Sequence, residues 1–166
     1  MKVEKIAFEK TNSFSDFFLN YVNENDKLKA FYNHFPTLQN FEKQIAEKQQ
    51  TFTEQARQVL VKSLTHQYQS ISLTDAENQN LQSLQNKSTF TITTGHQLNI
   101  FTGPLYFIYK VVTVISACKT LKEKFPAYDF VPVYWMASED HDYEEIKSFR
   151  LYNQKYSWNT QQQGAV

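Results

Sequence analysis

Cysteine is almost absent from this sequence of 166 residues, because Cys118 is the only one. A single cysteine excludes a disulfide within the chain and excludes a zinc ribbon, which needs several thiolates. The first ten residues are mixed and charged, without the apolar segment of a secretory signal. The longest apolar stretch, near residues 111–118, is too short to span a bilayer. We therefore expect a cytoplasmic protein that does not enter a membrane.

Glycine and net charge are also scarce. Only 3 glycines occur, where about a dozen would be usual for this length. Gly95 and Gly103 lie in one short stretch, which predicts a sharp backbone turn or the close approach of a ligand there. Lysine and arginine together number 17, as do aspartate and glutamate. A net charge of zero argues against a nucleic-acid partner, since nucleic-acid binders usually have a basic excess.

What the sequence does contain is a globular composition, with 41% hydrophobic and 16% aromatic residues. Its first half has the periodicity of helices. Ser13 has the position of a helix N-cap, and a long amphipathic helix is expected from about residue 37 to 68 unless the threonines at 51–53 break it. A capping box at 74–77 opens a further short helix. We predict a helical region at 1–88 that packs on the rest of the chain.

From residue 89 the pattern becomes that of an α/β fold. The segment 89–93 predicts a strand, 105 to about 124 a mostly buried helix, and the apolar run 130–137 a strand covered on both faces. Strand, helix and strand form a right-handed βαβ unit with parallel strands. The fold class is therefore α/β, with a Rossmann-like parallel sheet preceded by N-terminal helices. We expect residues 89–166 to be the first part of that core, which is truncated.

A polar loop follows each predicted strand. Loops after parallel strands emerge at the carboxyl edge of the sheet, where open α/β sheets bind ligands, so the two loops should face each other across one cleft. The first loop ends at a helix start, with Pro104 at the first helical position, where free N–H groups favour an anion. The candidate binding residues here are Thr94, Gly95, His96, Gln97, Thr102, Gly103, Tyr106 and Lys110.

The first loop also permits a plainer interpretation. It matches neither the phosphate-loop motif nor the GxGxxG motif of dinucleotide-binding proteins. An ordinary strand-to-helix turn capped by Thr102 therefore stays open. Lys110 could reach a phosphate, but it also suits a solvated helix position.

The second loop, Ser138-Glu139-Asp140-His141-Asp142, has four ionisable side chains directly after a buried strand. His141 is a candidate general base, or a metal ligand together with Asp140 or Asp142. We take these three as candidate catalytic residues, and Ser138 and Glu139 as candidate substrate-binding residues. The alternative is a helix N-terminus, with Ser138 or Asp140 as its cap and the acids complementing the helix dipole.

The remaining candidates outside the two loops have a structural interpretation. His34 and His66 have no apparent partners in the sequence and are interpreted as surface or packing residues. Cys118 lies in the apolar part of the predicted helix 105–124. We expect it to be a small buried hydrophobic residue.

Three motifs carry a resemblance to a known family. They are Thr94-Gly95-His96-Gln97, the segment 101–106 through Tyr109-Lys110, and the segment 137–142 with Glu144-Glu145. In order and spacing they resemble the cysteine-adding enzymes of bacillithiol biosynthesis. The resemblance extends over essentially the whole chain and covers roughly the first third of a family member of several domains. His96 is the one departure, because many relatives carry glutamine there.

The resemblance implies a ligase that joins cysteine to glucosaminyl malate in the last step of bacillithiol biosynthesis. The family's core is similar to nucleotidyltransferases and class I aminoacyl-tRNA synthetases, with connective insertions and a helical coiled-coil domain. By that analogy ATP, or another adenine nucleotide, would activate the cysteine carboxylate, and the sugar amine would attack it while His141 takes a proton. The partners implied are these small molecules, with a homodimer of the full-length protein as a further possibility.

Two other functions fit the same sequence. One is a nucleotidyltransferase-like module that binds a nucleotide at this sheet edge without ligating cysteine. The other is a non-enzymatic domain in which the helix at 37–68 is a partner interface. Loss of the full-length gene separates the ligase from the first alternative, because only loss of a ligase should deplete bacillithiol.

Overall fold

The computed structural model describes residues 3–139 and 143–161. Its contacts divide the chain into two compact units, Met1–Thr51 and Phe52–Val166. The sheet lies in the second unit together with the two helices that precede it. The domain boundary predicted at residue 88 stays a prediction.

The first unit consists of short helices: η1 (Phe8–Thr11), α1 (Asp16–Val22), η2 (Asp26–Phe31) and α2 (Phe41–Thr51). The N-cap of α1 is Ser15, whose hydroxyl accepts a hydrogen bond from the Phe18 N–H at 3.3 Å. The cap predicted at Ser13 was therefore wrong by two residues. The Ser13 hydroxyl instead donates to the Thr11 carbonyl at 3.0 Å, in the turn that joins η1 to α1.

His34, in the first unit, has a partner that the sequence did not reveal. Its Nε2 lies 2.8 Å from Oε1 of Glu47, and Asn33 donates to the other oxygen of the same carboxylate. The hydrogen bond from His34, and then that from Asn33, lowers the pKa of Glu47. The prediction that His34 has no partner was wrong because the two residues are 13 positions apart and meet only through folding.

The helix predicted from 37 to 68 is two helices, because α2 ends at Thr51 and α3 (Glu54–Gln67) begins after Thr53. Thr53 has an extended backbone, and its hydroxyl accepts from the Ala56 N–H at 3.1 Å. This cap confirms the alternative of a break at residues 51–53. The predicted capping box is confirmed at α4 (Asp75–Ser83), where the side chains of Thr74 and Glu77 each accept from the other residue's N–H.

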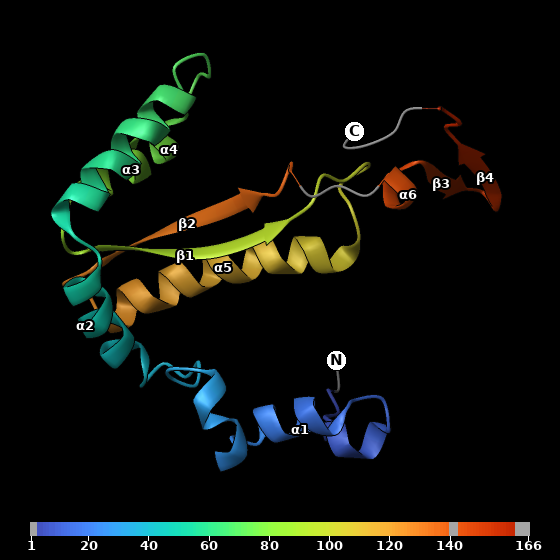
Figure 1. Cartoon of the computed structure of the whole chain (residues 1–166), viewed down its shortest axis with the longest axis horizontal. Coiled ribbons are helices and arrows are strands. Elements are labelled where there is room, and N and C mark those ends of the chain that lie inside the picture. Colours follow the sequence, from blue (N-terminus) through green and yellow to red (C-terminus); the bar gives the residue numbers. More distant parts are fainter. Residues whose placement is uncertain (1–2, 140–142, 162–166) are drawn as a thin grey trace. The chain divides into compact units, whose positions relative to one another are not determined.

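The predicted βαβ unit is confirmed. Strands β1 (Thr89–His96) and β2 (Asp129–Met136) pair in parallel, with Thr89 opposite Asp129 and His96 opposite Met136. The crossover between them is α5 (Leu105–Lys124). Figure 1 shows α5 running along the two strands.

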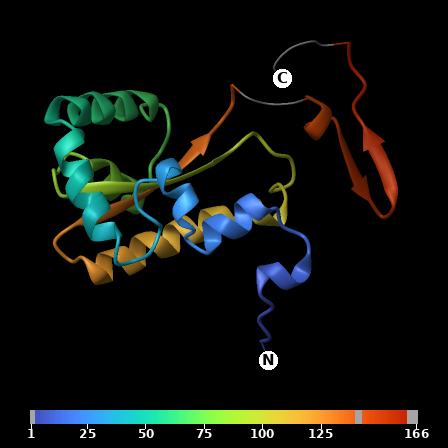
Figure 2. The ribbon, with the colours of Figure 1, turned by 60° about the horizontal axis from the view of Figure 1, so that its bottom comes forward.

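The second unit is layered, with α5 on one side of the strands and α3 with α4 on the other, as both ribbon views show (Figures 1 and 2). Val114, Cys118 and Leu121 are the buried residues of α5. Burial raises the pKa of the Cys118 thiol to about 11, so this cysteine is a small hydrophobic residue, as predicted. On the other side, a cavity of about 220 Å³ lies between α3, α4 and β2.

The prediction that α5 is mostly buried was wrong for this chain. Its apolar residues surround the helix, but only one face packs on the sheet, which has two strands among the described residues. The outward face leaves Leu105 66%, Tyr109 63% and Val112 55% exposed. No helix in the described part of the chain is long and apolar enough to cross a membrane.

The last described segment contains a short helix, α6 (Tyr143–Ile146), and an antiparallel hairpin of β3 (Ser148–Leu151) and β4 (Gln154–Ser157). Its turn residues, Tyr152 and Asn153, have φ of 48° and 65°. No residue pattern in the sequence predicted this hairpin.

Candidate functional site

The carboxyl ends of β1 and β2 lie side by side. Gly95 is opposite Trp135 and His96 is opposite Met136, and the pairing continues as the Ala137 N–H donates to the His96 carbonyl at 3.1 Å. The Tyr134 hydroxyl donates to the same carbonyl at 3.1 Å. Both predicted loops therefore leave the sheet at one edge, where parallel α/β sheets bind ligands.

His96 is the centre of a hydrogen-bond network at this edge. Its Nδ1 lies 3.0 Å from the Gln97 carbonyl, and its Nε2 lies 2.5 Å from the Tyr106 hydroxyl. Because a carbonyl can only accept, Nδ1 carries the proton in this contact, and Nε2 is left to accept from the tyrosine when the ring is neutral. The Asn99 amide donates to the Gln97 carbonyl at 3.1 Å, which fixes the loop beside the ring.

Lys110 also belongs to this edge. Its Nζ donates to the Gly95 carbonyl at 2.5 Å and lies 5.9 Å from the centre of the Tyr106 ring. Tyr106 and Lys110 are four residues apart in α5, so they share one face of the helix. The ammonium group is half-buried at the junction of β1 and α5 rather than extended into solvent.

The start of α5 has no side-chain cap. Pro104 is the N-cap residue rather than the first helical residue, and it offers no side-chain oxygen. The Thr102 hydroxyl donates to the Phe101 carbonyl, so Thr102 does not cap the helix. The Phe107 N–H donates to the Pro104 carbonyl at 2.9 Å, which leaves the N–H groups of Leu105 and Tyr106 for an anion, with the positive end of the helix dipole behind them.

Gly95 and Gly103 are each required at this edge, for different structural reasons. Gly103 has φ of +68°, and a Cβ there would lie 2.8 Å from the Asn99 side chain, so the turn requires glycine. Phe101 and Thr102 before it also have positive φ, of 50° and 68°. A Cβ at Gly95 would lie 2.9 Å from the Trp135 carbonyl, so Gly95 permits the close approach of β2.

The second loop is described only in part. Ser138 and Glu139 are exposed residues that follow the end of β2, and the Ser138 N–H donates to the Met136 carbonyl at 2.8 Å. The three candidate catalytic residues, Asp140, His141 and Asp142, lie outside the described residues. Among the described residues, no group of three histidine, cysteine, aspartate or glutamate side chains could hold a metal ion.

Sequence reasoning missed two side chains that shape this edge. Asn99 holds the loop beside His96, and Tyr134 joins the end of β2 to the end of β1. Phe107 of α5 packs against His96 and Tyr134, with its ring centre 5.9 Å from that of His96 and 5.5 Å from that of Tyr134. A polar aromatic residue near the end of a predicted strand was the signal that could have identified Tyr134.

Comparison with known proteins gives consistent matches. The family described as bacillithiol biosynthesis BshC, N-terminal Rossmann-like domain, matches residues 1–166. A protein of Flavobacterium johnsoniae is 50% identical over 166 residues, which are 100% of this chain and 31% of that protein. A protein of Flavobacterium psychrophilum is 47% identical over 167 residues, 100% of this chain and 32% of that protein. A protein of Cytophaga hutchinsonii is 40% identical over 164 residues, 99% of this chain and 31% of that protein.

These three relatives share one name, "Putative cysteine ligase BshC". The chain spans about a third of their length, at 31%, 32% and 31%. The matches therefore concern the N-terminal domain of a longer kind of protein.

Proposed function

This chain belongs to the family of the BshC N-terminal Rossmann-like domain, and from that premise we propose that the full-length protein is a cysteine ligase of bacillithiol biosynthesis. Its reaction would join the carboxyl group of cysteine to the amine of glucosaminyl malate, as the last step of the pathway. The observation that carries the proposal is the match to this family over residues 1–166, with relatives named as cysteine ligases at up to 50% identity.

The carboxyl edge of the sheet is the proposed substrate site. The uncapped start of α5 would bind an anionic group, either a substrate carboxylate or a phosphate. Lys110 would add positive charge behind that group. The hydrogen bond between Tyr106 and His96 would hold these two side chains in place beside it. The other proposed binding residues of this edge are Thr94, Gly95, Gln97, Thr102, Gly103, Ser138 and Glu139.

The described residues suit a nucleotide at this edge. Carboxylate activation is the chemistry that bound ATP, or another adenine nucleotide, would supply. The N–H groups at the start of α5 suit phosphate oxygens, since they are free of a side-chain cap. Trp135, 59% exposed at the end of β2, offers an aromatic surface for a base.

The catalytic assignment concerns the second loop. We propose that His141 takes a proton from the ammonium group of the substrate, so that the neutral amine attacks, and that Asp140 and Asp142 assist it. A general base beside the substrate amine is needed because only the neutral amine is a nucleophile. The two loops leave the same edge of the sheet, which supports the assignment of one shared site.

Thiol profiling of a strain that lacks the full-length gene tests the proposal. We expect bacillithiol to disappear and its sugar precursor, glucosaminyl malate, to accumulate. The intact gene should return both compounds to their normal levels. If bacillithiol persists at the normal level, the protein is not this ligase. That outcome would favour the nucleotide-binding module without ligase activity.

A further inference from the structure

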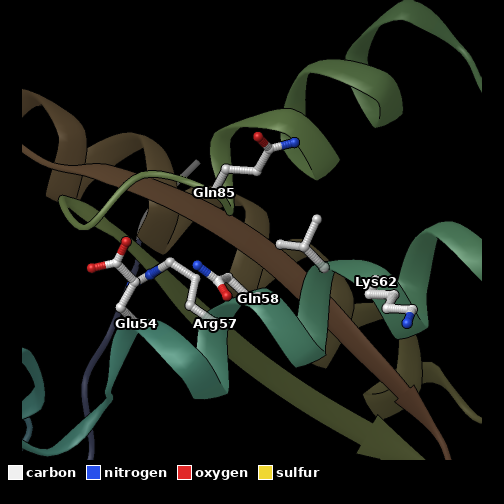
Figure 3. Close-up of a pocket in the computed structure, with 6 residues that line it drawn as sticks. Glu54, Arg57, Gln58, Lys62 and Gln85 are labelled. Carbon is white, nitrogen blue, oxygen red and sulfur yellow. The ribbon is translucent and has the colours of Figure 1, made fainter.

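A pocket of about 340 Å³ lies along α3, and none of its residues belongs to the carboxyl edge. It is lined by Glu54, Arg57, Gln58, Val61, Lys62 and Gln85. Figure 3 shows that Gln85 comes from the segment after α4, while the others project from α3. The volume lies at the lower end of the range of small-molecule sites, about 300–1,000 Å³.

Arg57 is the unusual residue of this pocket, because it is only 6% exposed. Its Nη1 donates to the Leu84 carbonyl at 2.7 Å and its Nη2 donates to the Thr89 carbonyl at 3.0 Å. A guanidinium group has five N–H donors, so these bonds use only part of its capacity. Both acceptors are neutral, and the carbonyls leave the positive charge uncompensated.

No carboxylate among the described residues forms an ion pair with Arg57. The Phe52 ring, with its centre 5.1 Å from the guanidinium carbon, gives a cation–π contact instead. Burial lowers the pKa of Arg57, yet an arginine stays charged at neutral pH. A buried charge without a counter-charge is costly, so an anion beside it would be favoured.

The rest of the pocket adds positive charge. Lys62 lines it and contributes a second cation. Its one carboxylate, Glu54, is paired with Lys87 at 2.9 Å. The amides of Gln58 and Gln85 supply donors that need no charge.

From the buried, uncompensated Arg57 and the cationic lining around it, we propose that this pocket binds a small-molecule oxyanion, a carboxylate or a phosphate. The planar fork of a guanidinium group matches two oxygens of either group. The site is separate from the proposed ligase site and does not depend on it.

Isothermal titration calorimetry on the full-length protein tests the proposal, with inorganic phosphate in one series and succinate in the other. Sodium chloride holds the ionic strength constant, because general screening would otherwise mimic binding. We expect saturable binding of at least one anion. Lys62→Gln should weaken it about threefold or more, and Lys119→Gln, an exposed position on α5 outside the pocket, should leave it unchanged.

Arg57→Gln should abolish the binding at the α3 pocket, with circular dichroism as the check that the variant is folded. Should Arg57→Gln unfold, the pair Lys62→Gln and Gln85→Ala carries the test alone, because both side chains lie outside the buried core. Binding of phosphate alone would identify a phosphate site, and binding of succinate alone a carboxylate site. Either result supports an oxyanion pocket.

Lys110→Gln separates this pocket from the proposed ligase site, where an anion is also expected. This variant should leave the affinity of the α3 pocket for the anion unchanged. Thiol profiling tests the ligase proposal independently of the pocket. Three results would contradict the proposal that this pocket binds an oxyanion. They are no saturable binding by the full-length protein, equal binding by wild type and the pocket variants, or binding lost only in Lys110→Gln.

Discussion

His141 is the side chain of the second loop whose ordinary pKa lies nearest neutrality, which makes it the candidate proton acceptor. In the full-length protein, His141→Ala should lower turnover by on the order of a hundredfold or more, as loss of a general base does. The melting temperature should change little, since a residue that serves chemistry contributes little to folding. Turnover and melting are measured on one preparation.

His66→Ala is the matched control, since His66 is exposed in the last turn of α3 and far in sequence from both loops. It should leave turnover unchanged. A folded His141→Ala variant with near-normal turnover would remove His141 from the mechanism. A large drop in melting temperature with little change in turnover would assign it to the start of a helix instead.

The position of Gly95 gives a prediction about the stability of the fold and not about catalysis. In Gly95→Ala the new methyl group would lie 2.9 Å from the Trp135 carbonyl and 3.1 Å from its Cβ, so β1 and β2 would have to separate locally. Overpacking of this kind costs about 1–3 kcal/mol of unfolding free energy. Urea unfolding of the full-length protein measures it.

Thr91→Ala is the control for Gly95→Ala, because Thr91 is an exposed position of the same strand. It should cost less than about 1 kcal/mol, the span of strand propensity. Equal unfolding free energies for wild type and Gly95→Ala would show that the strands are not as close as the structure has them.

The sequence predicted where the candidate site lies but not how its side chains meet. Parallel strands place both loops at one edge, and the register of Gly95 with Trp135 confirms that arrangement. The bond between His96 and Tyr106 depends instead on a turn in which three consecutive residues, 101–103, have positive φ. Residue patterns do not encode such a turn, since only Gly103 among the three is a residue that favours it.

Among the helices, the capping box of α4 gives a prediction about pH. Hydrogen bonds from the Thr74 N–H and hydroxyl lower the pKa of Glu77 below its ordinary value of 4.5. A lowered pKa in the folded state means that the ionised carboxylate stabilises the fold above pH 4.5 and that this contribution is lost as the pH falls through the folded-state pKa.

Glu77→Gln should therefore lower the melting temperature at neutral pH, and its difference from wild type should narrow as the pH falls below 4.5. Glu123→Gln, at an exposed position of α5, is the control and should show a smaller difference throughout. Thermal melts between pH 3 and pH 7 measure both variants. A difference that stays constant across that range would contradict the role of the ionised carboxylate.

Elements with strong periodic patterns were predictable, while short ones set by local turns were not. The apolar period continues through Phe52, so it could not by itself place the end of α2, which the hydroxyl of Thr53 decides by capping α3. The hairpin β3–β4 was missed because each strand has only 4 residues. Asn153, which tolerates positive φ, was its one turn signal.

At the scale of the whole molecule, the second unit leaves a row of large apolar side chains exposed on one helix. One face of α5 carries a stripe at helical spacing, with Leu105 66%, Ile108 44%, Tyr109 63%, Val112 55% and Ile115 42% exposed. The described sheet has two strands, so each strand has one unpaired edge. In relatives about three times as long, of which this chain covers 31%, further segments are available to cover these surfaces.

The 166-residue chain expressed alone should therefore self-associate, and the full-length protein should do so much less. Sedimentation velocity over a range of concentrations measures this, because association raises the mean sedimentation coefficient with concentration. Replacing Ile108 and Val112 together by lysine should reduce association of the short chain, since both are exposed and lie on one face of α5. The matched control replaces the exposed Lys119 and Glu123 of α5 by glutamine and should leave association unchanged. A short chain that sediments as a monomer at every concentration and melts in one sharp transition would mean that these surfaces need no cover.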